Sequence, residues 1–186
     1  MPSLYIRRSG FSLLELMITL AISAILLGLA VPSLQSFMGS SEISSTSNDF
    51  VYSLQTARSE SIKRAGPVGL CASANSLADE PTCGGGDYTA GWIVFYDEDG
   101  NGVRNAGDTV IQQVEARSPA FAFTADAVFA ERIYFGESGT SINPAGIPLG
   151  GNINISFAGG SEQRTVRISA NGRVTTTNPL LAGAGG

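Results

Sequence analysis

The chain is organised around the stretch Gly10-Phe11-Ser12-Leu13-Leu14-Glu15-Leu16, together with the apolar run that this stretch opens. A short leader, residues 1–10, precedes it and carries Arg7 and Arg8. No charged residue occurs over residues 16–34. An apolar run of about 20 residues is long enough to span the roughly 30 Å of hydrocarbon in a bilayer as a helix. The sequence therefore predicts a membrane-spanning helix over residues 11–34.

Glu15 is the one charge inside this apolar run. A carboxylate in a membrane helix costs on the order of 2.5–3.5 kcal/mol or more, so Glu15 needs a partner. Glu15 is the fifth residue after Gly10, so a cut after Gly10 would place a new amino terminus one helical turn away. Basic residues before an apolar helix stay in the cytoplasm, which places the rest of the chain on the other side of the membrane.

The N-terminal pattern resembles the class III signal peptide of type IV pilins and type II secretion pseudopilins. The resemblance implies that a prepilin peptidase cuts after Gly10 and methylates the new first residue, Phe11. It also implies that Glu15 pairs with the amine of a neighbouring subunit during assembly. The alternative is a plain signal anchor or a secretory peptide. A secretory peptide is cleaved after its apolar run; Ala21 and Ala24 could mimic such a site, but Glu15 would then be an unexplained cost.

Composition restricts the function of the remaining chain. Without the leader and the apolar run, about 150 residues remain, which suits one domain with its own core. The net charge is −5, and removal of the two leader arginines leaves 9 basic against 16 acidic residues, or −7. The bulk of the chain therefore lacks the basic face that phosphate binding needs. The chain has no histidine, the commonest general base. With no catalytic constellation in the sequence, we expect no enzymatic activity.

The chain divides into five predicted segments. They are a prepilin leader (1–10), a transmembrane and assembly half-helix (11–34), an amphipathic half-helix (35–65), a periplasmic β-rich domain (66–178) and a flexible tail (179–186). Pro32 cannot donate to the carbonyl of Gly28, and its ring crowds that turn. Gly28 makes the helix less stable in the same segment, so we predict a helix kink at Gly28 and Pro32.

Apolar residues at helical spacing, from Phe50 to Ile62, predict a helix that lies across a sheet and stops at Gly66-Pro67. Asn171-Gly172 is a hairpin turn signal between the last two of the strands that follow. The predicted strands are 68–72, 92–96, 109–114, 120–124, 132–135, 152–157, 165–169 and 173–176.

Cys71 and Cys83 are the only two cysteines. In an oxidising compartment they suggest one disulfide. A catalytic thiol would lack its histidine, and a metal site would need more ligands. A disulfide that closes a loop of this size stabilises a fold by roughly 3 kcal/mol in the chain-entropy model.

Residues 97–108 fit the pattern of a calcium-binding loop. Oxygen ligands occur at loop positions 1, 3, 5 and 12, which are Asp97, Asp99, Asn101 and Asp108. Glycine occupies position 6, and the Val103 carbonyl and Asn105 could serve at positions 7 and 9. The last ligand is Asp where Glu is usual, and no helix pair flanks the loop. The alternative is a polar hairpin connection in which Asp, Asn and Gly supply turn conformations. We expect no other cofactor.

Three arginines give the C-terminal region a local positive excess. After residue 160 the charged residues are three arginines, Arg164, Arg167 and Arg173, and one acid, Glu162. Two interpretations remain open: solvated strand faces, or a patch that contacts the phosphates of DNA.

The later segments resemble a narrower family, the FimT/FimU minor pilins with the H-type pseudopilin GspH of type II secretion systems. The resemblance rests on residues 57–64, Val68-Gly69-Leu70-Cys71, Cys83, residues 91–95 with the loop after them, and Gly172-Arg173-Val174. It implies an α+β fold in which a long N-terminal helix, its first half transmembrane, packs on antiparallel β-sheets.

This narrower resemblance also implies a function. Such proteins occur at low copy, often near a pilus tip, where they help to prime assembly. The implied partners are other major and minor pilins, the prepilin peptidase and the inner-membrane assembly platform. The implied location is the bacterial inner membrane, as a single-pass protein with a periplasmic domain, and then the pilus at the cell surface. Some members bind DNA in natural transformation through a Gly-Arg-x-Arg motif. This chain has Gly172 and Arg173 of that motif, but Thr175 stands in place of the second arginine.

Overall fold

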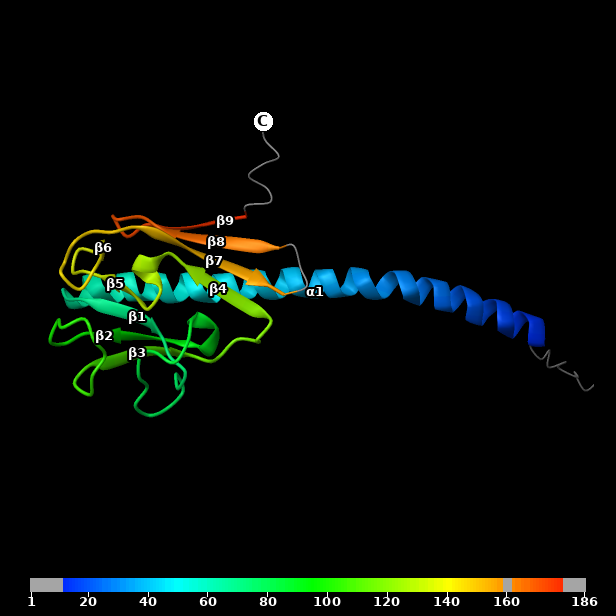
Figure 1. Cartoon of the computed structure of the whole chain (residues 1–186), viewed down its shortest axis with the longest axis horizontal. Coiled ribbons are helices and arrows are strands. Elements are labelled where there is room, and N and C mark those ends of the chain that lie inside the picture. Colours follow the sequence, from blue (N-terminus) through cyan, green and yellow to red (C-terminus); the bar gives the residue numbers. More distant parts are fainter. Residues whose placement is uncertain (1–11, 159–161, 179–186) are drawn as a thin grey trace, which may run out of the picture. The chain divides into compact units, whose positions relative to one another are not determined.

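The computed structural model describes residues 12–158 and 162–178, without the side chains of residues 27–38. One long helix, α1 (Leu13–Arg64), is followed by nine strands and two short 3-10 helices (Figure 1). The chain forms two compact units, residues 1–38 and residues 39–186.

The N-terminal unit contains the first part of α1. Ser12 caps this helix, because its Oγ accepts a hydrogen bond from the backbone N–H of Glu15 at 3.2 Å. Its carbonyl accepts the first helical hydrogen bond, from Leu16, at 3.1 Å. The pair Ser12 and Glu15 also has the Ser-x-x-Glu spacing of a capping box. The sequence therefore contained a helix start signal here in addition to the apolar run.

The C-terminal unit begins within α1, whose last turn ends in a Schellman motif. The N–H of Gly66 donates to the carbonyl of Ser61 at 3.2 Å, and the N–H of Ala65 donates to that of Ile62 at 3.4 Å. Ala65 has a φ of 49°, which is the left-handed conformation that this motif requires and that glycine usually supplies. The predicted stop at Gly66 is thus confirmed.

The first sheet is antiparallel and has the strand order β3-β2-β1-β5-β6. Both faces of its central strand are buried, which is why this strand is continuously apolar and does not alternate. The strands are β1 (Val68–Ala72), β2 (Trp92–Tyr96), β3 (Thr109–Val114), β5 (Arg132–Phe135) and β6 (Ser141–Ile142).

The second sheet is also antiparallel and has the order β4-β7-β8-β9. In β8 the buried side chains of Val166 and Ile168 alternate with the exposed side chain of Arg167, which is the pattern of a half-buried strand. The strands are β4 (Phe121–Ala125), β7 (Gly151–Phe157), β8 (Gln163–Ile168) and β9 (Val174–Thr177).

The main core lies between the later part of α1 and the two sheets, which flank it in Figure 1. Phe50 of α1 is the centre of this core. Its ring lies 5.1 Å from that of Tyr88 in the 3-10 helix Tyr88–Ala90, 5.3 Å from Trp92 of β2 and 5.5 Å from Phe123 of β4. One helical side chain therefore contacts both sheets.

The predicted elements agree with the structure to within two residues at their ends. Three details differ. The two-residue strand β6 was not predicted, because it is too short to show a pattern. Ile62, expected on the buried face of the helix, is 51% exposed, whereas its neighbour Ser61 is fully buried. The β8–β9 loop has three residues, since Ser169 pairs with Arg173 and the N–H of Gly172 donates to the carbonyl of Ser169.

Candidate functional site

The first part of α1 exposes a continuous apolar surface. Glu15 is exposed among these side chains. The large apolar side chains, each at least half exposed, are Leu13, Leu14, Leu16, Met17, Ile18, Leu20, Ile22, Ile25 and Leu26. Apolar side chains on all sides of a helix are typical of a helix that is buried in a membrane or among other chains.

Several predicted sites lie in parts of the chain about which little is described. Gly10 and Phe11, the predicted processing site, lie outside the described residues. The helical hydrogen-bonding pattern of α1 continues through Gly28 and Pro32, so the proline does not interrupt the helix. A kink at these two residues stays a prediction.

Within the ranges that are described, no helix has a stretch that is both long enough and apolar enough to cross a membrane.

The loop between β2 and β3 brings the predicted calcium ligands together. Asp97 is almost fully buried, and its carboxylate accepts hydrogen bonds from the N–H groups of Gly102 at 2.8 Å and Asn101 at 3.2 Å. Burial raises the pKa of the Asp97 carboxyl; the hydrogen bond from Gly102 opposes this rise, and the nearby carboxylates of Asp99 and Asp108 add to it.

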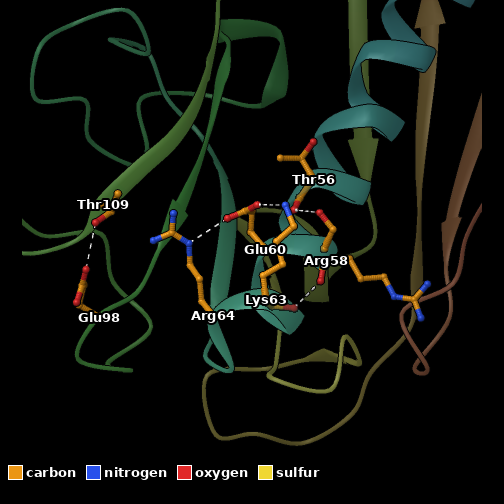
Figure 2. Close-up of polar contacts among 9 residues, drawn as sticks. Thr56, Arg58, Glu60, Lys63, Arg64, Glu98 and Thr109 are labelled. Carbon is orange, nitrogen blue, oxygen red and sulfur yellow. Dashed lines mark hydrogen bonds and ion pairs between the residues drawn. The ribbon is translucent and has the colours of Figure 1, made fainter.

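Asp108, at the far end of this loop, holds its two ends together. One of its carboxylate oxygens accepts from the N–H of Glu98 at 3.0 Å and the other from the N–H of Asn105 at 2.7 Å. Figure 2 shows the adjoining contact between Glu98 and Thr109, at 3.1 Å. Carboxylate oxygens of Asp97, Asp99 and Asp108 lie within 4.8 Å of one another. The structure therefore gathers three of the four predicted ligands.

Asn101, the fourth predicted ligand, plays a different part. Its Oδ1 accepts from the N–H of Val103 at 2.7 Å, and its Nδ2 donates to Asp99 at 2.7 Å. The amide side chain therefore orients Asp99.

The three C-terminal arginines do not form one patch. Arg164 shares the core-facing side of β8 with Val166 and Ile168, and it donates to Glu162 at 3.3 Å and to Ser44 of α1 at 3.4 Å. Arg167 lies on the opposite face and is exposed. Arg173 precedes β9, where the strand register places it on the same face as Arg167. Of these three arginines, Arg167 and Arg173 alone lie on the outer face.

The predicted disulfide is confirmed: Cys71 and Cys83 are bonded. Cys71 is fully buried on the outer face of the first sheet, in a second, smaller core with Ile93, Phe95 and Tyr134. The disulfide therefore ties the loop after β1 over the face of the sheet that the helix does not cover.

Arg58 is a site residue that the sequence does not single out, because a charged residue on the polar face of a helix is ordinarily exposed to solvent. Its Nε donates to the carbonyl of Gly139 at 3.0 Å, and its Nη2 donates to that of Asn171 at 3.4 Å. Two residues further, Glu60 accepts from Lys63 at 2.7 Å and from Arg64 at 3.0 Å (Figure 2). Arg58 thus joins the helix to the turns after β5 and β8.

Comparison with known families assigns the chain. A family model described as Type II transport protein GspH matches residues 46–172, which contain the later part of α1 and every strand from β1 to β8. The chain belongs to the GspH family. A second model, described as Prokaryotic N-terminal methylation motif, matches residues 6–31 of this GspH-family chain.

A solved structure agrees with the fold of this GspH-family chain. It is similar to the crystal structure of the type IV minor pilin FimU from Pseudomonas aeruginosa, with a TM-score of 0.52 and 20% identity over 77% of this chain and 96% of FimU. A second crystal form of FimU gives a TM-score of 0.49 and 19% identity over 73% of this chain and 96% of FimU. No curated protein matches the sequence. The pilin fold that the sequence predicted is confirmed.

The family and the methylation motif together make this GspH-family chain a minor pilin or pseudopilin. Proteins of this class are structural and not enzymatic, and they assemble with other pilins and the pilus machinery. The methylation motif also indicates a prepilin-type signal and a membrane-anchored pilin.

Proposed function

We propose that this GspH-family chain is a minor pilin that primes the assembly of a type IV pilus or sits near its tip. It is made as a prepilin in the inner membrane, cut between Gly10 and Phe11, methylated on Phe11, and added to the filament through α1. The single observation that carries this proposal is the exposed apolar surface of α1 with Glu15 inside it.

The exposed side chains supply the driving force. Full burial of one large apolar side chain contributes about 1.5–3 kcal/mol. A helix with nine such side chains exposed is therefore strongly driven into hydrocarbon or against neighbouring helices.

Glu15 supplies the specificity of docking between neighbouring subunits. An ionised carboxylate in apolar surroundings is stabilised only when it has a partner. A methylated amino terminus on Phe11 of a neighbouring subunit would be such a partner. Glu15 also holds the N3 position of the helix start, where Gln serves nearly as well. Replacement by Gln therefore separates the charge of Glu15 from its place in the helix cap.

The test is a gene deletion complemented with Glu15→Val, Glu15→Gln and, as a control on the same helix, Glu42→Gln. Glu42 is exposed and lies outside the apolar run. We expect surface pili, counted by electron microscopy, to be restored by the wild type and the control only. Normal piliation with Glu15→Gln would contradict the proposal that the charge of Glu15 forms an ion pair during assembly. Replacement of Gly10 by Val should block cleavage between residues 10 and 11. The Gly10→Val variant should therefore keep the mass of the unprocessed chain.

A secretion role is the first alternative, because the family model carries the description Type II transport protein. In that case the deletion would leave pili unchanged and would stop the export of secreted enzymes to the medium. Neighbouring genes for an outer-membrane secretin with secretion components, in place of pilin genes, would favour it.

DNA binding is the second alternative, and the shared outer face of Arg167 and Arg173 favours it. A retardation assay over a range of salt concentrations tests it. Arg167→Gln and Arg173→Gln should each weaken binding and reduce the salt slope by about 1. Arg164→Gln is the matched control, because Arg164 faces the core and is paired with Glu162. Loss of binding in the control alone, or no salt-sensitive binding at all, would exclude this function.

A further inference from the structure

We propose that the β2–β3 loop, residues 97–108, binds one Ca²⁺ ion through the carboxylates of Asp97, Asp99 and Asp108. This inference does not depend on whether the protein serves a pilus or a secretion system. It assigns a metal site to the loop that closes one end of the first sheet.

The spacing of the carboxylates fits such an ion. Calcium binds oxygen at about 2.3–2.6 Å, so two oxygens on the same ion lie at most about 5 Å apart. One oxygen from each of Asp97, Asp99 and Asp108 lies within 4.8 Å of the others. Hydrogen bonds from backbone N–H groups already hold Asp97 and Asp108 in place, so the ion would enter a preformed site.

An independent observation comes from β5, which lies two strands from β2 in the first sheet. The hydroxyl of Tyr134 is buried and has no hydrogen-bond partner among the described residues. A buried polar group without a partner is unfavourable and rare, and it commonly marks a water molecule or an ion. Tyr134 is 3% exposed.

The hydroxyl of Tyr134 lies close enough to the carboxylates of Asp97 and Asp108 to interact with their charges. Tyr134 lies on the outer face of the first sheet with Phe95, and Asp97 follows β2 at a position that continues this face. A Cβ at Gly69, between the two strands, would come within about 3.0 Å of the Tyr134 ring, so the ring lies over this glycine. Tyr134 and Asp97 line the same cavity of about 390 Å³. A water molecule bound to the ion would give the hydroxyl its missing partner.

The donor chemistry selects calcium. The site offers only oxygen atoms, which hard cations prefer. The chain has no histidine, and both cysteines are bonded to each other, which removes the nitrogen and sulfur ligands that zinc favours. Two arginines lie close to the loop. Arg104, inside it, is paired with Glu80 at 3.0 Å. The guanidinium of Arg132 donates to the carbonyl of Gly102 and to Glu131, and it lies near the Tyr134 hydroxyl without the geometry of a hydrogen bond. The three carboxylates therefore keep a net negative charge that a divalent ion would balance.

The experiment is a calorimetric titration of the purified full-length chain with CaCl₂ after treatment with EGTA. We expect one ion per chain with a dissociation constant of about 10⁻⁴–10⁻³ M, the range of extracellular calcium sites, and much weaker binding of MgCl₂. Calcium should also raise the midpoint of thermal unfolding. No heat of binding at millimolar calcium, or equal binding of both ions, would overturn the proposal.

Two variants and one control locate the ion. Asp99→Asn removes the charge of an exposed ligand and should weaken calcium binding about 10-fold or more, with an unchanged midpoint in EGTA. Asp79→Asn, at an exposed acid outside the loop, should bind calcium like the wild type. Tyr134→Phe should weaken binding several-fold, because the ion's water loses a hydrogen bond. An unchanged affinity in Asp99→Asn would overturn the site, and one in Tyr134→Phe would overturn its place beside the phenol.

Discussion

Gly172 packs against the carbonyl oxygen of Gly139 so closely that a Cβ at position 172 would overlap that oxygen. Gly172 also has a φ of +75°. The same carbonyl accepts a hydrogen bond from Arg58 of α1. The glycine of the Gly172-Arg173 pair is therefore needed where the helix and the turns after β5 and β8 meet.

Gly172→Ala should destabilise the protein by about 3 kcal/mol or more, because the new methyl group forces backbone apart in addition to the unfavourable φ. Gly146→Ala is the matched control. Gly146 has a similar φ of +79°, and nothing lies within 4 Å of its Cβ position. The control should lose only about 1–2 kcal/mol, the cost of a left-handed conformation. Urea unfolding of both variants measures the difference, and equal losses would contradict the packing argument.

Ala65→Gly should stabilise the protein by about 0.5–1 kcal/mol. Ala65 occupies the left-handed position of the Schellman motif, where glycine avoids the strain of a Cβ. The gain is smaller than the strain itself, because glycine also gains freedom in the unfolded chain. Thermal unfolding should show a higher midpoint. A lower midpoint would mean that the packing of the alanine methyl outweighs its strain.

Removal of the disulfide by the double substitution Cys71→Ala and Cys83→Ala should cost roughly 3 kcal/mol, the chain-entropy value for a loop of this length. The two cysteines are separated by 12 residues. Reduction of the wild type with dithiothreitol should lower its unfolding midpoint in urea by a similar amount and leave that of the variant unchanged. A smaller loss in the reduced wild type than in the variant would show that the variant also loses the packing of its buried sulfur atoms.

Glu60 should make stability depend on pH. Hydrogen bonds from Lys63, and secondarily from Arg64, lower the pKa of Glu60 below its ordinary 4.5. A lowered pKa in the folded state means that the stabilisation is present above about 4.5 and is lost as the pH falls through the folded value. These are surface pairs, worth about 0.3–0.5 kcal/mol each. Glu60→Gln should therefore be slightly less stable than the wild type at pH 7, and the gap should close at pH 3.

Much of the fold could be predicted, because its signals are local. The alternation of Val166 and Ile168 with polar residues identified β8, and the continuous apolar runs identified β1 and β2. The same alternation places Arg164 on the core face, opposite Arg167, so the splitting of the arginine patch could have been inferred. The spacing of Ser12 and Glu15 also predicts the start of the helix.

Contacts between distant segments could not be predicted in this way. Arg58 and Gly139 are separated by 81 residues, and no periodic pattern connects a helical arginine with a turn carbonyl. The unpartnered hydroxyl of Tyr134 likewise depends on the pairing of β1 with both β2 and β5, which brings this side chain to the loop at Asp97. Such contacts follow from sheet order, and sheet order was not predicted from the sequence.

The place of Phe50 between the two sheets has a mechanical consequence. Force applied along the part of α1 that belongs to the C-terminal unit would load these contacts in shear, because Phe50 touches Trp92 of β2 and Phe123 of β4 at the same level of the helix. The hydrogen bonds of Arg58 lie two turns further along the same helix. Contacts loaded in shear share the load and must break together, whereas contacts that are peeled break one by one. A fold built in this way is suited to bear tension along its helix.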